Sequence, residues 1–175
     1  MPNAGETARM PRDIGIRVAE AGDIPAVIRL DTRITGISKP DYWTDMFERY
    51  GRRSNRFFLV AEDNGGTLIG FIIGEVRAWE FGSPPCGWIF AIGVDPEIRL
   101  RKVGSHLFNA MCRCLEDAGV DTVRTMLLRN DELNMTFFRS QGMMGGPFIQ
   151  LEMPLADRAG NDDFGLGERD TRDPG

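Results

Sequence analysis

The chain has 175 residues, of which 42% are hydrophobic and 27% are charged, and its formal net charge at pH 7 is −5. This length and composition are typical of a single globular domain with a hydrophobic core. An acidic chain lacks the surplus of lysine and arginine that non-specific nucleic-acid binding requires, so we expect no nucleic-acid partner.

The first half of the chain predicts one strand, two helices and a β-hairpin. Residues 14–18 alternate as a strand does, and Asp23 offers an N-cap to a helix with Pro25 in its first turn. A second helix is expected around residues 42–50. The segments RFFLVAE and TLIGFIIGEV are typical of two strands, and the turn signal DNGG between them predicts a hairpin.

The second half predicts two more helices among three strands. WIFAIGV, residues 88–94, is an apolar strand, and the helix after Gly104 has the clearest apolar face in the chain. A strand over 121–128, a short helix over 131–142 and a last alternating strand over 148–153 follow. The order β-α-α-β-β-β-α-β-α-β places the chain in the α/β (α+β) class, with a mixed sheet and helices on its faces.

Composition divides the chain into three parts. Residues 1–13 are polar and small and predict a flexible N-terminal arm. Residues 156–175 are rich in glycine, aspartate and arginine and predict a disordered polar tail. The domain itself is expected over residues 14–155.

The cysteines and the N-terminus indicate the compartment. The first residues, MPNAGETARMPRD, contain no apolar run of the signal-peptide kind, and no stretch approaches ~18 consecutive apolar residues. The number of cysteines is odd, and none of them forms a C-x-x-C pair; they are Cys86, Cys112 and Cys114. The single histidine is His106. We therefore expect a cytoplasmic protein with free thiols, no membrane partner and no metal.

A cluster of cations follows the strand that ends at Val94. The stretch VDPEIRLRKVGSHLFNAM brings Arg99, Arg101 and Lys102 just before Gly104 and an amphipathic helix. The first N–H groups of a helix lack internal partners and its dipole attracts anions, so a pyrophosphate is the expected ligand. No G-x-x-x-x-G-K-[ST] or G-x-G-x-x-G motif is present, which argues against a nucleotide-binding P-loop or dinucleotide fold. The alternative is a solvated basic helix start with ordinary turn residues.

This stretch resembles the signature of the GNAT superfamily of acyl-CoA-dependent N-acyltransferases, V-x-P-x-x-R-G-x-G-x-G-x-x-L. Val94, Pro96, Arg99, Gly104 and Leu107 stand in matching register. The resemblance also covers the order of elements over about 14–155, and it implies a GNAT-like, mostly antiparallel sheet. The core of this signature is Q/R-x-x-G-x-G/A, and Lys102 departs from it, because it stands where that core has its first glycine; a positive φ there would strain a lysine.

The resemblance implies acetyl-CoA as the acyl donor and assigns residues to it. The pantetheine would lie between residues 88–94 and 121–128, against the backbone of Ile92, Gly93 and Val94. The pyrophosphate would lie on the loop and helix start, and two further contacts would come from the helix over 131–142. The residues concerned are Arg99, Leu100, Arg101, Lys102, Val103, Gly104, Ser105, Asp131 and Phe138.

The resemblance leaves the proton-transfer groups unsettled. The family often uses a carboxylate on the strand before the loop, and GWIFAIGV contains none. Glu75 and Glu80 are the nearest carboxylates; Glu80 is the preferred base, against the alternative of a solvated charge, and Glu75 could instead be ion-paired with an arginine. Phe138 stands where the family often has a tyrosine acid.

The resemblance implies an N-acetyltransferase that moves the acetyl group of acetyl-CoA to a primary amine of a small molecule or protein by direct attack. The family usually shapes its acceptor site with the region that contains Tyr42, Trp43 and Tyr50 here. The alternatives are a non-catalytic acyl-CoA-binding module, acting as a sensor or interaction domain, and an α/β domain without a coenzyme. Because many GNAT proteins pair, a homodimer is a further expectation.

Overall fold

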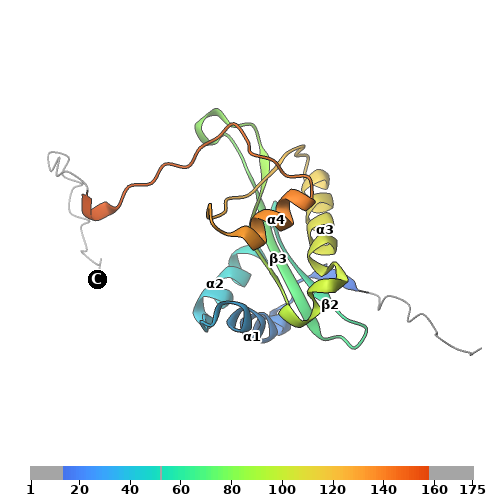
Figure 1. The fold of residues 1–175 in the computed structure, drawn as a ribbon. Helices are drawn as coiled ribbons and strands as arrows, with labels where there is room; N and C mark the ends of the chain where they lie inside the picture. The colour runs from blue at the N-terminus through green and yellow to red at the C-terminus, as the bar shows by residue number, and fades with distance from the viewer. Residues whose placement is uncertain (1–13, 52, 158–175) are drawn as a thin grey trace, which may run out of the picture. The chain divides into compact units, whose positions relative to one another are not determined.

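The computed structural model describes residues 14–51 and 53–157. Its described residues divide into two units, one ending at Met143 and one beginning at Met144. The first unit contains the sheet, four α-helices and three short 3₁₀ turns (Figure 1). The elements are β1 (Gly15–Val18), α1 (Ile24–Thr35), α2 (Pro40–Tyr50), β2 (Arg56–Glu62), β3 (Leu68–Arg77), β4 (Cys86–Val94), α3 (Val103–Asp117), β5 (Val123–Arg124) and α4 (Glu132–Ser140).

The five strands form one sheet in the order β1-β2-β3-β4-β5. The first three pairings are antiparallel, and β4 pairs with β5 in parallel. The predicted hairpin is confirmed as β2 and β3, with Phe58 opposite Ile73 and Val60 opposite Phe71. The predicted mixed, mostly antiparallel sheet is therefore confirmed.

Residues of the central strands alternate between two hydrophobic clusters. On β2, Phe58 and Val60 pack with α1 and α2, whereas Leu59 and Ala61 pack with α3 on the other face. All four side chains are at most 4% exposed. Because successive strand residues point to opposite faces, a strand buried on both faces is apolar throughout. The helices thus cover both faces of the sheet.

The predicted helices and strands up to residue 118 are present in the structure, and the differences concern the strands predicted after that residue. The strand expected over 121–128 is reduced to Val123–Arg124. The last expected strand, 148–153, is wrong: these residues are described and form no strand. Ile149 and Leu151 are 84% and 86% exposed. Alternation predicts which side chains share a face, but a strand also needs a neighbour for its backbone hydrogen bonds. The order therefore ends at α4, apart from the 3₁₀ turn Leu155–Asp157.

Two predictions about the chain ends lie wholly or partly outside the described residues. The N-terminal arm, 1–13, lies outside them, as does the tail from residue 158 onward. The domain boundary at residue 155 stays a prediction.

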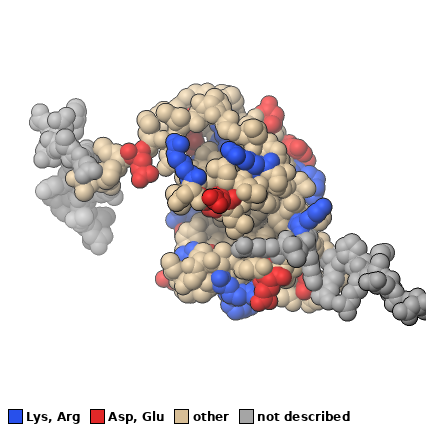
Figure 2. All heavy atoms as spheres, viewed as in Figure 1, with Lys and Arg blue, Asp and Glu red and all other residues tan. Residues whose placement is uncertain are grey.

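Basic and acidic side chains are interspersed on the face of the molecule shown in Figure 2. There the described lysine and arginine side chains stand apart, with acidic side chains and uncharged surface between them. A continuous positive surface attracts anions from a distance, whereas scattered cations act only on a ligand close to them. On this face, an anion would be held by its immediate contacts.

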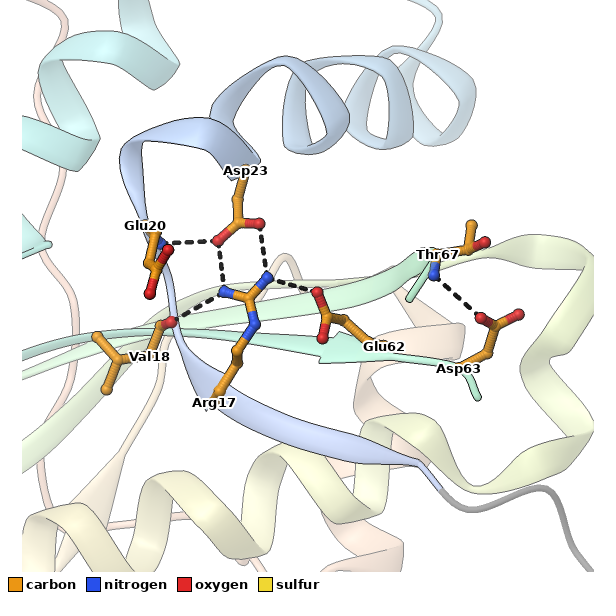
Figure 3. A network of polar contacts seen from close by, with 7 residues as sticks. All are labelled: Arg17, Val18, Glu20, Asp23, Glu62, Asp63 and Thr67. Atoms are coloured by element: carbon orange, nitrogen blue, oxygen red, sulfur yellow. Dashed lines mark hydrogen bonds and ion pairs between the residues drawn. The ribbon is translucent and has the colours of Figure 1, made fainter. Parts of the chain in front are cut away.

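An ion-pair network ties the first strand to the start of α1 (Figure 3). The Arg17 guanidinium on β1 donates to both oxygens of Asp23, at 2.7 and 2.8 Å, and also to Glu62 on β2. Asp23 additionally accepts the backbone N–H of Glu20 at 2.7 Å, so its side chain caps the 3₁₀ turn before α1. The hydrogen bonds from Arg17 lower the pKa of Asp23 below its usual value.

Lys102, the residue just before α3, has a strained backbone conformation. Lys102 is the N-cap of α3 and lies in the left-handed region, at φ 57° and ψ 22°. A Cβ in that region costs about 1–2 kcal/mol, and glycine avoids the cost. The strain expected for a lysine at this position is therefore present.

We expect Arg17→Met to destabilise the fold by roughly 1–2 kcal/mol near neutral pH, with allowance for the solvent that reaches Arg17. Because the folded pKa of Asp23 is lowered, its contribution is present above the unfolded pKa and is lost as the pH falls below it. The difference between variant and wild type should shrink towards about pH 3. Urea unfolding at both pH values measures it, with Arg29→Met as the control; a pH-independent difference would contradict the assignment.

Lys102→Gly should stabilise the protein by about 0.5–1 kcal/mol, because glycine relieves the left-handed strain. Lys102→Ala is the matched control, since it removes the same charge and keeps a Cβ at the same backbone angles. Urea unfolding of the two variants compares them directly. Equal stability of the glycine and alanine variants would show that the strain is absent in solution.

Candidate functional site

Over the stretch in which β3 and β4 pair, β4 contains one residue more than β3. In the register of β3 and β4, Gly74 lies opposite Ile89 and Ile73 lies opposite Ala91, which leaves Phe90 without a partner. Phe90 and Ala91 consequently both pack towards the face covered by α1 and α2, although they are consecutive. Such a β-bulge bends its strand and increases the local twist.

The bulge coincides with the end of pairing between β4 and β5. The two strands pair only at Gly87 with Val123 and at Trp88 with Arg124. Beyond Trp88, the β5-facing backbone of β4 has no strand partner among the described residues. The gap expected between residues 88–94 and 121–128 is therefore present, and it opens within two residues of the bulge.

A cleft of about 540 Å³ occupies this gap. Residues 89–93 of β4 form one wall, and residues 125–128, which follow β5, form the other. Phe71 of β3 and side chains at α1, α2 and α4 complete the lining. Ile92 and Gly93 line the cleft as expected from the sequence; Val94 is the next residue and marks the end of β4.

A buried aspartate anchors the loop that follows β4. The Asp95 carboxylate accepts the backbone N–H of Glu97 at 3.1 Å and a hydrogen bond from Arg33 of α1 at 2.7 Å. Its own backbone N–H donates to Ile69 at 2.9 Å. The loop then forms the 3₁₀ turn Pro96–Arg101. The side chains of Arg99, Leu100 and Arg101 lie outside the described residues.

The first backbone N–H groups of α3 precede the hydrogen bonds of the helix itself. The first helical hydrogen bond runs from the His106 N–H to the Lys102 carbonyl at 3.0 Å, so the N–H groups of Val103, Gly104 and Ser105 precede it. Lys102 is exposed beside them and forms no ion pair with a described residue. These donors, the helix dipole and the lysine together make a favourable environment for an anion.

The glycine at this helix start has a packing role that sequence reasoning missed. A Cβ on Gly104 would lie 3.0 Å from the ring of Phe137 in α4. One residue later, the Ser105 hydroxyl accepts a hydrogen bond from the Gln141 amide at 3.1 Å. The small residue at 104 therefore lets α3 approach α4 closely, in addition to any approach of a ligand.

The two predicted catalytic carboxylates do not line the cleft. Glu80 is exposed, in the 3₁₀ turn Glu80–Gly82 between β3 and β4. Glu75, with a side chain 13% exposed, accepts from Arg77 at 2.9 Å and from the Tyr50 hydroxyl at 3.0 Å, with Arg56 at 3.8 Å. Burial and the hydrogen bond to Glu75 raise the pKa of Tyr50, so this tyrosine is protonated near neutral pH. The catalytic role of either carboxylate stays a prediction.

The two predicted contacts on α4 do line the cleft. Asp131 is the N-cap of α4, and its oxygens accept from the backbone N–H and side-chain amide of Asn134 at 3.1 and 2.7 Å. Phe138 is 4% exposed and packs edge-on against Phe108 and Phe137. Its ring therefore combines a core role with a place in the cleft wall, and it carries no proton donor.

A buried carboxylate in the cleft was missed from the sequence. Asp31 of α1 is 5% exposed and lines the cleft together with Lys39 and Trp43. The Trp43 indole N–H donates to Asp31 Oδ2 at 2.9 Å, and the Lys39 ammonium lies 2.9 Å from the same oxygen. Asp31 falls four residues after the core residue Val27, on the apolar face of α1, and that spacing was the available signal.

The described part of the chain holds no cluster of three or more histidine, cysteine, aspartate or glutamate side chains placed to bind a metal ion. No helix within it has the length and apolar character needed to cross a membrane.

Curated relatives of the chain are found among mycothiol acetyltransferases. The one from Thermobispora bispora is 30% identical over 145 residues, which cover 78% of this chain and 47% of that protein. The one from Arthrobacter sp. (strain FB24) is 33% identical over 66 residues, or 38% of this chain and 20% of that protein. The chain therefore spans about half the length of the first relative, and less of the second.

Solved structures with the same fold include aminoglycoside N-acetyltransferases. The enzyme AAC(6')-Iy in complex with CoA superposes with a TM-score of 0.73 at 16% identity, covering 85% of this chain and 99% of that one. AAC(6')-Ih from Acinetobacter baumannii gives a TM-score of 0.71 at 11% identity, covering 82% and 99%. At these identities the likeness concerns the fold.

The family model of the GNAT acetyltransferases matches residues 24–143, from the start of α1 to just past α4. The matched segment contains the bulged strand, the cleft and the loop before α3. With the fold and the cleft on the same residues, this chain belongs to the GNAT family of acetyltransferases.

Proposed function

We propose that this GNAT-family acetyltransferase transfers the acetyl group of acetyl-CoA to a primary amine of a small molecule or protein. The single observation that carries the proposal is the cleft between β4 and β5, where β4 leaves backbone groups without a strand partner. An extended, amide-containing ligand can pair with such an edge as an added strand does.

The residues around the cleft fit the donor. The backbone groups on the β5-facing side of β4, in the segment Ile92, Gly93 and Val94, would hydrogen-bond the pantetheine amides. At the far end of β4, the α3 N–H groups and Lys102 would hold the pyrophosphate. Arg99 and Arg101, from the same loop, would add charge-assisted contacts. The cleft wall formed by Phe138 would lie along the apolar part of the pantetheine.

Acetyl-CoA, when bound, supplies an acyl thioester, and the chain's part is to orient it and to stabilise developing charge. A β4 N–H aimed into the cleft would donate to the carbonyl oxygen as it becomes an anion. A protonated amine must lose two protons in becoming an amide; one goes to the departing thiolate and one to water. No covalent intermediate with the enzyme is needed.

In this proposal the CoA thiolate leaves without being protonated by a side chain of the enzyme. Phe138 stands on α4 where a hydroxyl donor would be expected, and its ring is packed among aromatic neighbours. A thiol has a reference pKa of about 8.5, so a thiolate is a tolerable leaving group near neutral pH. Water or the acceptor would return the proton.

A second candidate is a non-catalytic acyl-CoA-binding module. Two observations favour it: neither Glu75 nor Glu80 lines the cleft, and the Phe138 side chain has no acidic proton to donate. Such a module would bind acetyl-CoA and release no thiol.

Two further parts of the proposal concern the protein's surroundings. Cys86, Cys112 and Cys114 are free thiols, which persist in a reducing compartment and support a cytoplasmic location. Burial raises the pKa of Cys112 and Cys114, which makes these thiols less reactive.

We extend the proposal to a homodimer because GNAT proteins commonly pair; gel filtration with light scattering would test it.

Calorimetric titration of acetyl-CoA should show binding to the wild type and at least ~10-fold weaker binding to Lys102→Glu, since the change reverses a charge beside the pyrophosphate site. Arg113→Glu is the matched control: it makes the same charge change on the exposed side of α3, beyond its first turns. Equal loss in both variants would mean a long-range charge effect and would remove the site from the α3 start.

The same wild-type protein should release CoA thiol in the presence of acetyl-CoA and at least one member of a panel of alkylamines and lysine peptides. Product identified by mass spectrometry would exclude the non-catalytic candidate. Tight acetyl-CoA binding with no product across the panel would favour that candidate instead.

Glu80→Gln should lower turnover about 10²–10⁴-fold if Glu80 is the general base, the role predicted from the sequence. It should leave turnover within about twofold of wild type if Glu80 is the solvated charge, the alternative that its exposure outside the cleft favours. Glu75→Gln should lower stability by roughly 1–2 kcal/mol, because it leaves Arg77 and Arg56 without their partner. Steady-state rates and urea unfolding separate the two effects. A 100-fold lower kcat for a fully folded variant would instead identify that carboxylate as the base.

A further inference from the structure

Two side chains that line the cleft contact the ammonium group of Lys39, and a third, Trp43, supports both of them. Its Nζ lies 2.9 Å from Asp31 Oδ2 and 5.8 Å from the centre of the Tyr42 ring. The Trp43 ring meets Tyr42 edge-on at 5.1 Å, and its indole N–H holds Asp31 in place at 2.9 Å. We call Asp31, Tyr42 and Trp43 the ammonium cage.

The chemistry of the cage suits an alkylammonium ion, and the Lys39 ammonium lies there. A carboxylate supplies the opposite charge, and an aromatic face attracts a cation through its quadrupole. Asp31 is 5% exposed, and a buried carboxylate is costly unless a cation accompanies it. Trp43 and Lys39 both contact Oδ2, and no described residue donates to Oδ1.

The cage opens into the cleft already assigned to the acyl donor. Asp31, Lys39, Tyr42 and Trp43 line the same cavity as Ile92 and Gly93 of β4. Asp31 comes from α1, and the other three come from the start of α2, so the cage lies on the helical side of the cleft. A molecule bound there would face the strand that holds the thioester.

We propose that the ammonium cage binds the ammonium group of the acceptor, and that Lys39 is a built-in occupant which the acceptor displaces. This inference rests on the proposed function, and it narrows the acceptor to a cationic alkylamine. Replacing one ammonium by another keeps Asp31 paired throughout, so the exchange avoids an unpaired buried charge. Lys39 can leave because its side chain is 35% exposed.

The competing explanation is a purely structural ion pair between α1 and α2. The two explanations predict opposite changes in the KM for the acceptor when Lys39 is replaced. If Lys39 competes with the acceptor, Lys39→Gln should lower KM for the acceptor about 3–10-fold. If the pair is only structural, the same change should weaken the fold and leave KM unchanged or higher. Asp31→Asn should raise KM at least ~10-fold under the proposal, because it removes the charge from the cage.

The first experiment measures binding, so that it does not depend on turnover. Tyramine is titrated into ¹⁵N-labelled protein with CoA present, and the Trp43 indole N–H resonance, assigned with Trp43→Phe, is followed. Tyramine should shift this resonance, with a several-fold lower Kd in Lys39→Gln and weaker binding in Asp31→Asn. The analogue 4-ethylphenol, which lacks the ammonium group, should cause no shift.

The second experiment repeats the comparison in the thiol-release assay, with Asp45→Asn as the matched control. Asp45 is an exposed carboxylate on α2 that pairs with Arg49, and its loss should not change KM. No tyramine-dependent shift, or an unchanged Kd in folded Lys39→Gln, would overturn the inference. Failure of acetyl-CoA to bind would instead overturn the proposed function, and a cage that binds tyramine without turnover would leave the inference standing.

Discussion

Phe90 has no partner on β3, and the strand that contains it leaves β5 almost immediately. A continuous ladder would fill the space between the two strands with their own hydrogen bonds. The extra residue instead bends β4, leaves part of its backbone without a partner, and creates a cleft that helices from both faces can border. That separation opens the cleft around which the other parts of the site lie: the loop before α3, the cage on α1 and α2, and the wall from α4.

Periodicity was enough to predict the helices and the β2–β3 hairpin, because their apolar residues recur at the spacing of the buried face. It could not reveal the bulge. WIFAIGV is apolar on both faces, so a one-residue change of phase leaves its pattern unaltered. The reverse error occurred at 148–153, where side chains alternate as in a strand but no described backbone pairs with them.

The loop before α3 could be predicted from the sequence, whereas the ammonium cage could not. Proline, arginine and glycine at fixed spacing before a helix report a local arrangement, so the start of α3 could be predicted from residues 94–107. Asp31 becomes informative only when α2 brings Lys39 and Trp43 to it. Glu75 shows the opposite case: an isolated carboxylate in an apolar strand resembles a catalytic group, and the structure gives it two arginines and a tyrosine.

Helix α1 contacts both the ammonium cage and the loop before α3. Asp31 belongs to the ammonium cage, and two residues later Arg33 holds Asp95, which anchors the loop before α3. A displacement of α1 caused by a ligand at one of these two places would therefore alter the contacts at the other. Thermodynamic reciprocity then requires that donor and acceptor change each other's affinity by the same factor, so this single helix would make the two substrates cooperative partners in binding.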